Sequence, residues 1–248
     1  MLGGEQVEGR QAVRELLRAG TRRVREVWLA EGIDEADAVA DITAAARQAG
    51  IPVRPVGRGR LDAAAGTSAP QGVLAFAEPV PEAELADLAR RRVGGPPPFL
   101  LVLDGVTDPH NLGALLRTAL CAGATGAVLG RHRSAHLTPA AVKAAVGAVE
   151  YLPIALVSGV PAALAELKAA GVWTVGLDGG GDQPLWGLEV AIEPVAIVLG
   201  AEGRGLARLT GQRCDVVVQV PTQGPLGSLN VAAAGALACF EVARRRRL

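Results

Sequence analysis

Two short apolar runs near the end of the chain, each followed directly by a glycine-rich segment, constrain the fold more than any other feature. Val195–Leu199 continues as GAEGRGL, and Val216–Val220 continues as PTQGPLGSLN. A long alanine-rich segment follows, and its helix would be capped by Ser228 or Asn230. Because glycine lets the backbone approach a ligand closely, this arrangement predicts a site in which main-chain N–H and C=O groups do much of the binding.

Strand and helix patterns alternate from residue 99 onward. Apolar strands are expected at Phe99–Leu103, Ala127–Leu129, Leu152–Val157 and Val172–Leu177, with helices at Leu112–Ala122, Leu137–Val149 and Pro161–Ala170. Such alternation is typical of a parallel sheet that helices cover on both faces. Ligands of these sheets bind at the carboxyl ends of strands, so Leu177, Leu199 and Val220 predict one crevice.

The beginning of the chain has its own pattern. Val7–Ala19 is expected to form an amphipathic helix with arginines on its polar face, and strands are expected at Val24–Ala30, 51–56 and 72–77. Proline and glycine are dense in 80–98, which is typical of a linker. The sequence therefore predicts a small α/β domain at 1–79, a linker at 80–98 and a second domain at 99–248.

Charge and aromatic content limit how this chain can bind nucleic acid. It has 25 Lys and Arg against 25 Asp and Glu and a pI of about 6.8, so any basic surface must be local. Only 3% of its residues are aromatic, which argues against stacking as the main means of reading RNA. The candidate basic groups lie near the start and in mid-chain: Arg10, Arg14, Arg18, Arg22, Arg23 and Arg25, and Arg131, His132 and Arg133.

The cysteines and the apolar segments indicate a soluble cytoplasmic protein. Cys121, Cys214 and Cys239 have no metal-ligand spacing, and we expect them to be reduced and packed as small apolar residues. No signal peptide is apparent at the N-terminus. Leu229–Ala243 is too short and too closely flanked by arginines to span a membrane.

Several common chemistries lack their sequence signals here. The glycine spacing of GAEGRG differs from the dinucleotide-binding GxGxxG, and no strand is followed by GxxxxGK[ST]. No GxSxG motif surrounds Ser228. His110, His132 and His136 have no partner pattern, so no metal site is predicted. A ligand held by backbone groups and small side chains remains.

Three segments carry a family resemblance: LDGVTDPHNLGALLRTA, VLGAEGRGL and VPTQGPLGSLNVAAAGA. They resemble, in order and spacing, the motifs of the SpoU (TrmH-type, SPOUT superfamily) RNA ribose 2′-O-methyltransferases. EGRQAVRELL is similar to the start of the RNA-binding domain of the 23S rRNA guanosine members. The resemblance implies a trefoil-knotted α/β domain after a small L30e-like domain. It also implies S-adenosylmethionine as cofactor, an RNA substrate, most simply a guanosine of 23S rRNA, and a homodimer.

The resemblance also assigns roles to individual residues. Those implied at the cofactor are Leu177, Leu199, Gly200, Glu202, Val220, Ser228, Leu229 and Asn230. Those implied in catalysis are Arg117, Asn111, Glu202, Ser228 and Asn230.

Arg117 is the central candidate among them. The family mechanism gives this arginine the role of a base, whereas a guanidinium that stays protonated would instead stabilise charge on the ribose oxygen. Asn111 would orient Arg117 or the ribose, and Glu202 would hold Arg117 or the substrate. Ala144 and Ala145 stand where many members have a serine, which is a departure from the family pattern.

Three other readings remain open. One is an antibiotic-resistance rRNA 2′-O-methyltransferase of the same family. Another is a catalytically silent RNA-binding or ribosome-assembly factor, although the presence of Arg117, Asn111, Glu202, Ser228 and Asn230 counts against it. A nucleotide-dependent oxidoreductase is the most distant alternative.

Overall fold

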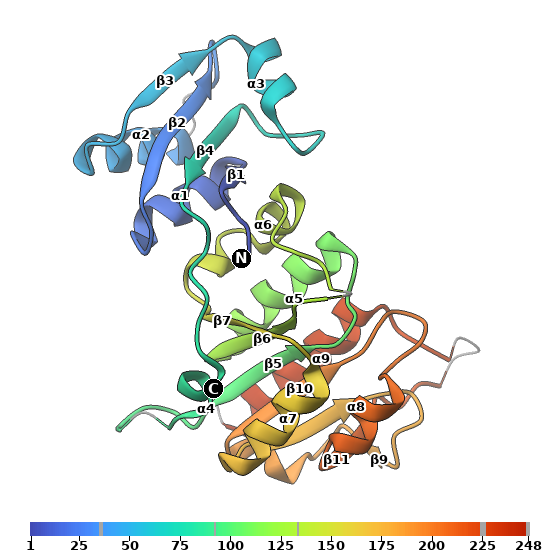
Figure 1. The fold of residues 1–248 in the computed structure, drawn as a ribbon. Coiled ribbons are helices and arrows are strands. Elements are labelled where there is room, and N and C mark those ends of the chain that lie inside the picture. Colours follow the sequence, from blue (N-terminus) through green and yellow to red (C-terminus); the bar gives the residue numbers. More distant parts are fainter. Residues whose placement is uncertain (35–36, 92, 133, 224–226, 247–248) are drawn as a thin grey trace. The chain divides into compact units, whose positions relative to one another are not determined.

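The chain divides into two compact units in the computed structural model, which describes residues 1–34, 37–91, 93–132, 134–223 and 227–246. One unit contains Met1–Pro81 together with His136–Tyr151, and the other contains Glu82–Ala135 and Leu152–Leu248 (Figure 1). The segment His136–Tyr151, which the sequence placed in the second domain, thus packs with the N-terminal residues.

The N-terminal unit is built on a four-stranded sheet of order β1-β4-β2-β3. Its strands are β1 (Gln6–Glu8), β2 (Val24–Ala30), β3 (Val53–Val56) and β4 (Val73–Ala77), of which only β2 and β3 pair in parallel. Its helices are α1 (Arg10–Ala19), α2 (Asp37–Gln48), α3 (Arg58–Ala64), α6 (Pro139–Ala145) and the 3₁₀ turn η1 (Ala148–Glu150). α1 packs against α2, whereas Leu61 of α3 packs on Val56 and Leu74 of the sheet.

Two predicted helices of this unit are shorter than expected. Val7 pairs with Ala75 in a strand, and Gly9 at φ 91° breaks the chain before α1 begins, so the helix predicted from Val7 starts at Arg10. The helix predicted over Leu137–Val149 ends at Ala145, because the next two residues adopt left-handed backbone angles.

The second unit contains a seven-stranded, wholly parallel sheet of order β7-β6-β5-β10-β8-β11-β9. The strands are β5 (Phe99–Leu103), β6 (Gly126–Gly130), β7 (Ile154–Val157), β8 (Trp173–Leu177), β9 (Gln183–Pro184), β10 (Val195–Leu199) and β11 (Val216–Gln219). Its helices are α4 (Leu85–Ala89), α5 (Pro109–Cys121), α7 (Val160–Ala169), α8 (Arg208–Arg213), α9 (Val231–Arg245) and the 3₁₀ turn η2 (Glu189–Ile192).

Helices cover both faces of this sheet, as the buried strands predicted. α5 and α9 pack together on one face, while α4, α7 and α8 pack on the other (Figure 1). Every residue of β5 and β10 is buried, which explains why these strands read as continuous apolar runs. α8 and the short β9 are additions that the sequence pattern did not reveal.

The helix caps around the expected site are now defined. α5 begins at Pro109 and is capped by Asp108, whose Oδ1 accepts from the His110 N–H at 2.7 Å, so Asn111 lies inside the helix rather than at its cap. α9 is capped by Asn230, whose Oδ1 accepts from the N–H groups of Ala232 and Ala233 at 2.9 and 3.3 Å.

The thiols differ in environment. Cys121 is exposed, so the expectation that all three cysteines pack in the interior is wrong for this one. Burial raises the pKa of Cys214 to about 11 and that of Cys239 to about 12. Within the described part of the chain, no helix is long and apolar enough to cross a membrane, and no group of three potential metal ligands was found.

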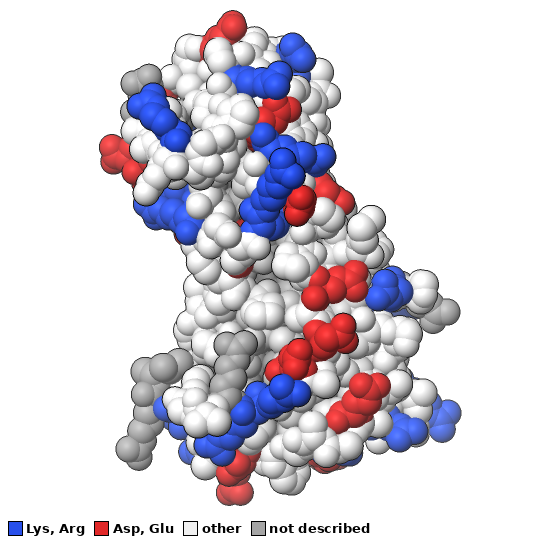
Figure 2. Space-filling model, turned by 60° about the vertical axis from the view of Figure 1, so that its left-hand side comes forward, with Lys and Arg blue, Asp and Glu red and all other residues white. Residues whose placement is uncertain are grey.

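Both basic and acidic side chains are spread over the face that Figure 2 shows. Of the basic candidates, Arg14 and Arg18 both pair with Asp41, at 3.7 and 2.8 Å. Arg131 pairs with Glu82 at 3.4 Å, and Arg133 lies outside the described residues. Much of the basic charge predicted to face RNA is therefore already paired with carboxylates.

Candidate active site

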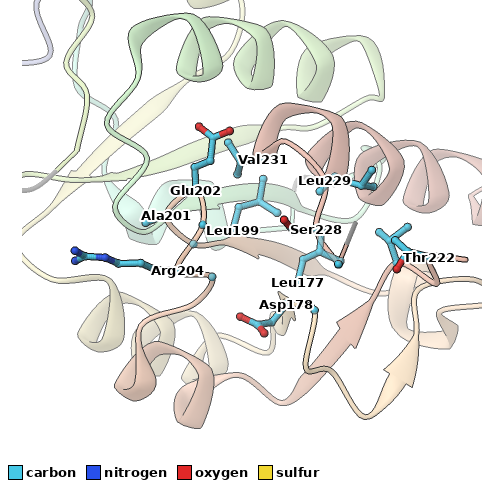
Figure 3. Close-up of a pocket in the computed structure, with 17 residues that line it drawn as sticks. Leu177, Asp178, Leu199, Ala201, Glu202, Arg204, Thr222, Ser228, Leu229 and Val231 are labelled. Atoms are coloured by element: carbon cyan, nitrogen blue, oxygen red, sulfur yellow. The ribbon is translucent and has the colours of Figure 1, made fainter. Parts of the chain in front are cut away.

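The carboxyl ends of β8, β10 and β11 surround a cavity of about 280 Å³ (Figure 3). It is lined by the loops that follow these strands and by the start of α9: Leu177, Asp178, Gly179, Leu199, Gly200, Ala201, Glu202, Gly203, Arg204, Gly205, Val220, Thr222, Gly227, Ser228, Leu229, Val231 and Ala234. The volume lies near the lower end of the range of ligand pockets, roughly 300–1,000 Å³. The three strand ends thus enclose a single ligand-sized space.

The structure brings together all of the residues that the sequence assigned to the cofactor except Asn230. Leu177, Leu199, Gly200, Glu202, Val220, Ser228 and Leu229 line this one cavity. Asn230 follows them at the cap of α9. The structure shows where these residues lie, and the role of each of them remains a prediction.

Asp178 fixes the shape of the cavity, although the sequence gave it no role. Its Oδ1 accepts from the N–H of Gly180, and its Oδ2 accepts from the N–H of Leu206, both at 2.9 Å. One carboxylate therefore joins the loop after β8 to the loop after β10. The position of Asp178 directly after a buried strand was the available signal for such a residue.

Gly200 is required by the close approach of two backbone segments. A Cβ at this position would overlap the carbonyl group of Gly205, and the N–H of Gly205 in turn donates to the carbonyl of Ala201 at 2.9 Å. The loop after β10 folds back on itself here, and only glycine leaves room for that turn.

Three polar side chains join α5, α9 and the loop after β10. The Asn111 amide donates to Glu202 Oε2 at 3.1 Å, and the Asn230 amide donates to Glu202 Oε1 at 3.0 Å and to Asn111 Oδ1 at 3.2 Å. Both oxygens of the Glu202 carboxylate are thereby held by neutral donors. We call this group the Asn–Glu–Asn cluster.

A second hollow of about 470 Å³ adjoins the first. It lies between the loop after β5 and the loop after β10, and Asp104, Asp108, Asn111 and Glu202 contribute to its walls. Ala201, Glu202, Arg204, Gly205 and Val231 line both hollows. Glu202 therefore lies on the boundary between two neighbouring hollows. Each hollow could hold one of two reacting molecules.

Arg117 occupies a different position from the one we expected. It is exposed, lines neither hollow, and makes no hydrogen bond or ion pair with any residue that the structure describes. Arg117 lies six positions after Asn111 in the α-helix, so the two side chains project about 120° apart and lie roughly 9 Å apart along the axis. Glu202 is hydrogen-bonded to Asn111 and Asn230, and not to Arg117.

Comparison with known proteins agrees with this geometry. Residues 98–240 match the model of the SpoU rRNA Methylase family, and residues 6–83 match that of the RNA 2′-O ribose methyltransferase substrate binding family. The chain belongs to the SpoU rRNA methylase family. It is 39% identical over 247 residues to the 23S rRNA (guanosine-2′-O-)-methyltransferase RlmB of Pseudomonas putida, covering 98% of each protein.

Two solved structures share the fold of nearly the whole chain. AviRb from Streptomyces viridochromogenes, in complex with AdoMet, superposes with a TM-score of 0.81 at 24% identity, over 97% of this chain and 89% of its own. The AdoMet-bound rRNA methyltransferase from Sinorhizobium meliloti gives a TM-score of 0.78 at 26% identity, over 98% and 87%. The predicted fold class, a knotted parallel-sheet domain preceded by a small α/β domain, is confirmed.

Proposed function

We propose that this protein transfers a methyl group from S-adenosylmethionine to the ribose 2′-hydroxyl of a guanosine in 23S rRNA. The observation that carries the proposal is the convergence of the SpoU motif loops on two adjoining hollows, in a chain that matches an RlmB protein along its whole length. We further propose that residues 1–79 contact the RNA, that 80–98 form a linker and that 99–248 perform the transfer. We also propose that the protein acts in the cytoplasm, because its proposed substrate is ribosomal RNA.

The first hollow suits the cofactor. Its walls are rich in main-chain groups and glycine, and the close turn of the loop after β10 is possible only because Gly200 has no Cβ. Leu177, Leu199, Val220 and Leu229 would contact the apolar parts of the cofactor, and the backbone of Gly200 and Ser228 would bind its polar edge. S-adenosylmethionine would supply an activated methyl group on its sulfonium. The chain would align the acceptor oxygen, and the 2′-hydroxyl would release its proton to Glu202 or to water.

The Asn–Glu–Asn cluster would hold that acceptor. Glu202 lines both hollows, so a ribose in the second hollow would meet it next to the cofactor in the first. We propose that Glu202 accepts a hydrogen bond from the ribose and that Asn111 and Asn230 keep the carboxylate in place. Ser228 would contact the reacting groups, and Arg117 would stabilise charge on the attacking oxygen.

Replacing Gly200 by alanine is expected to weaken cofactor binding by about 10–100-fold. The new Cβ would force apart the backbone at Gly205, and overpacking of this kind costs about 1–3 kcal/mol. Titration calorimetry with S-adenosylmethionine measures the effect. Gly179→Ala is the matched control, because it lines the same cavity but its Cβ would lie 3.8 Å from the nearest atom, the Gly227 carbonyl oxygen. Equal affinities for both variants would contradict the prediction.

Asn230→Asp separates the two roles of this side chain. Aspartate still caps α9, so thermal stability should change little. It cannot donate to Glu202 and places a second carboxylate beside it, so methyl transfer should fall about tenfold or more, from lost hydrogen bonds and like-charge repulsion. Asn230→Ala should lose both activity and helix stability. An active Asn230→Asp enzyme would remove the cluster from the mechanism.

Transfer of tritiated methyl groups to 23S rRNA transcribed in vitro tests the proposed function directly. Labelled RNA in which primer extension maps the modification to a guanosine ribose is the expected result. Labelling at another ribose would favour the antibiotic-resistance reading. RNA binding without transfer, in the presence of bound cofactor, would favour a silent RNA-binding protein.

We also propose that the protein is a homodimer. Trp186, Leu229, Leu237 and Phe240 are 47%, 44%, 37% and 51% exposed, and they line one shallow apolar hollow beside α9. A patch of large, exposed apolar side chains is typical of a contact surface. Sedimentation should show a dimer, and Phe240→Asp should shift it to a monomer.

A further inference from the structure

The polar face of α1, which the sequence offered as the RNA-contacting surface, is largely neutralised in the structure. Arg14 and Arg18 pair with Asp41, and Arg18 also approaches Glu15 at 3.4 Å. Arg22 is buried against Glu150, with 3% of its side chain exposed. A surface whose guanidinium groups are already bonded to carboxylates offers little to an RNA phosphate, so the contact must be sought elsewhere in the N-terminal unit.

The four-stranded sheet of the N-terminal unit carries two of the few aromatic side chains in this protein. Trp28 on β2 and Phe76 on β4 are only partly buried, and their rings meet edge to face with centroids 5.1 Å apart. They border the small core cluster in which the seven-residue helix α3 packs through Leu61. The chain has only seven aromatic residues, three Trp, one Tyr and three Phe, and two of them meet on this sheet.

Two arginines of α3 have their charge available, and one of them lies against the Trp28 ring. Arg58 and Arg60 are exposed and form no ion pair with any described residue. The Arg60 guanidinium lies over the Trp28 ring, 5.3 Å from its centroid. Gly59, between the two arginines, has no atom within 4 Å of where a Cβ would be, so the backbone here faces open space. The nearby Arg54 is neutralised by Glu26 at 2.7 Å.

We infer that Trp28, Phe76, Arg58 and Arg60 form a binding surface for single-stranded RNA, which we call the Trp28 surface. A planar guanidinium resting on an indole presents its outer side to an unpaired base, while a second free arginine can bind the adjoining phosphate. Duplex RNA would not expose bases to such a surface, so a loop or bulge of the substrate fits it best. This inference rests on the proposed function and names the part of the RNA-binding unit that makes the contact.

The double variant Arg58→Ala/Arg60→Ala tests the Trp28 surface in the full-length protein. Filter binding to an in vitro transcript of 23S rRNA should show the dissociation constant raised about tenfold or more. The slope of log affinity against log salt should also fall by about 0.7, because the one phosphate contact proposed for Arg58 is lost. The matched control, Arg14→Ala/Arg18→Ala, removes the same charge from α1 and should bind RNA as the wild type does.

Two further measurements separate RNA contact from damage to the fold or to catalysis. Trp28→Leu keeps an apolar group over α3 but removes the stacking partner, and should also weaken RNA binding. Cofactor affinity by calorimetry should be unchanged in all of these variants. Unchanged RNA affinity in the α3 variant, or an equal loss in the α1 control, would overturn the inference. Wild-type protein that binds RNA through this surface but transfers no methyl group would refute the proposed function and leave the surface standing.

Discussion

Glu150→Ala is expected to lower the free energy of unfolding by about 3–5 kcal/mol, because it leaves the Arg22 guanidinium buried without its counter-charge. The two side chains are 3% and 1% exposed and meet through two hydrogen bonds of 2.9 and 2.7 Å. Arg22 also donates to the carbonyl oxygens of Gly4 and Glu78, at 2.7 and 2.5 Å. It therefore cannot turn out to solvent without breaking backbone contacts as well.

Denaturation in guanidinium chloride measures this loss against a matched exposed pair. Asp41→Ala removes the partner of Arg18, whose side chain is 49% exposed, and should cost about 1 kcal/mol or less. The double variant Arg22→Met/Glu150→Leu replaces the buried pair with apolar groups of similar size and should recover most of the lost stability. A Glu150→Ala protein as stable as the Asp41→Ala protein would show that the buried pair adds nothing.

The same ion pair shows what a sequence pattern cannot supply. In the sequence, Arg22 was one of several arginines on a basic segment, and Glu150 directly followed a helix predicted in the second domain. Their partnership spans 128 positions and assigns His136–Tyr151 to the N-terminal unit. Amphipathic periodicity shows which face of a helix is polar, but it does not show which carboxylate will lie opposite.

The strands and the cavity were predictable for a physical reason. Strands buried on both faces must be apolar throughout, so β5 and β10 were recognisable in the sequence as short apolar runs with sharp ends. The carboxyl ends of parallel strands lie along one edge, which is why Leu177, Leu199 and Val220 reached the same space. The sequence did not reveal the role of Asp178, because its carboxylate accepts from the backbone N–H of Leu206 in a distant loop. It did not reveal α8 either, because this helix has only six residues and contains Gly211.

Arg117→Ala is expected to reduce kcat for methyl transfer by about 100–1,000-fold, the usual cost of removing one donor that stabilises charge on a reacting oxygen. Cofactor affinity should be unchanged, because Arg117 does not line the first hollow. Arg213→Ala, which removes an exposed arginine from α8, is the control and should keep full activity. Near-normal turnover of the Arg117→Ala enzyme would exclude this residue from the mechanism.

The position of Arg117 on α5 makes a second experiment informative. Its side chain projects away from the Asn–Glu–Asn cluster, so either bound RNA draws it toward the ribose or the second subunit of the dimer supplies it. Mixing Arg117→Ala subunits with Gly200→Ala subunits distinguishes these arrangements. In a mixed dimer, the first subunit has an intact cofactor cavity and the second an intact arginine. Activity that appears only in the mixture would show that Arg117 acts across the dimer, whereas a mixture as inactive as its components would place its action within one chain.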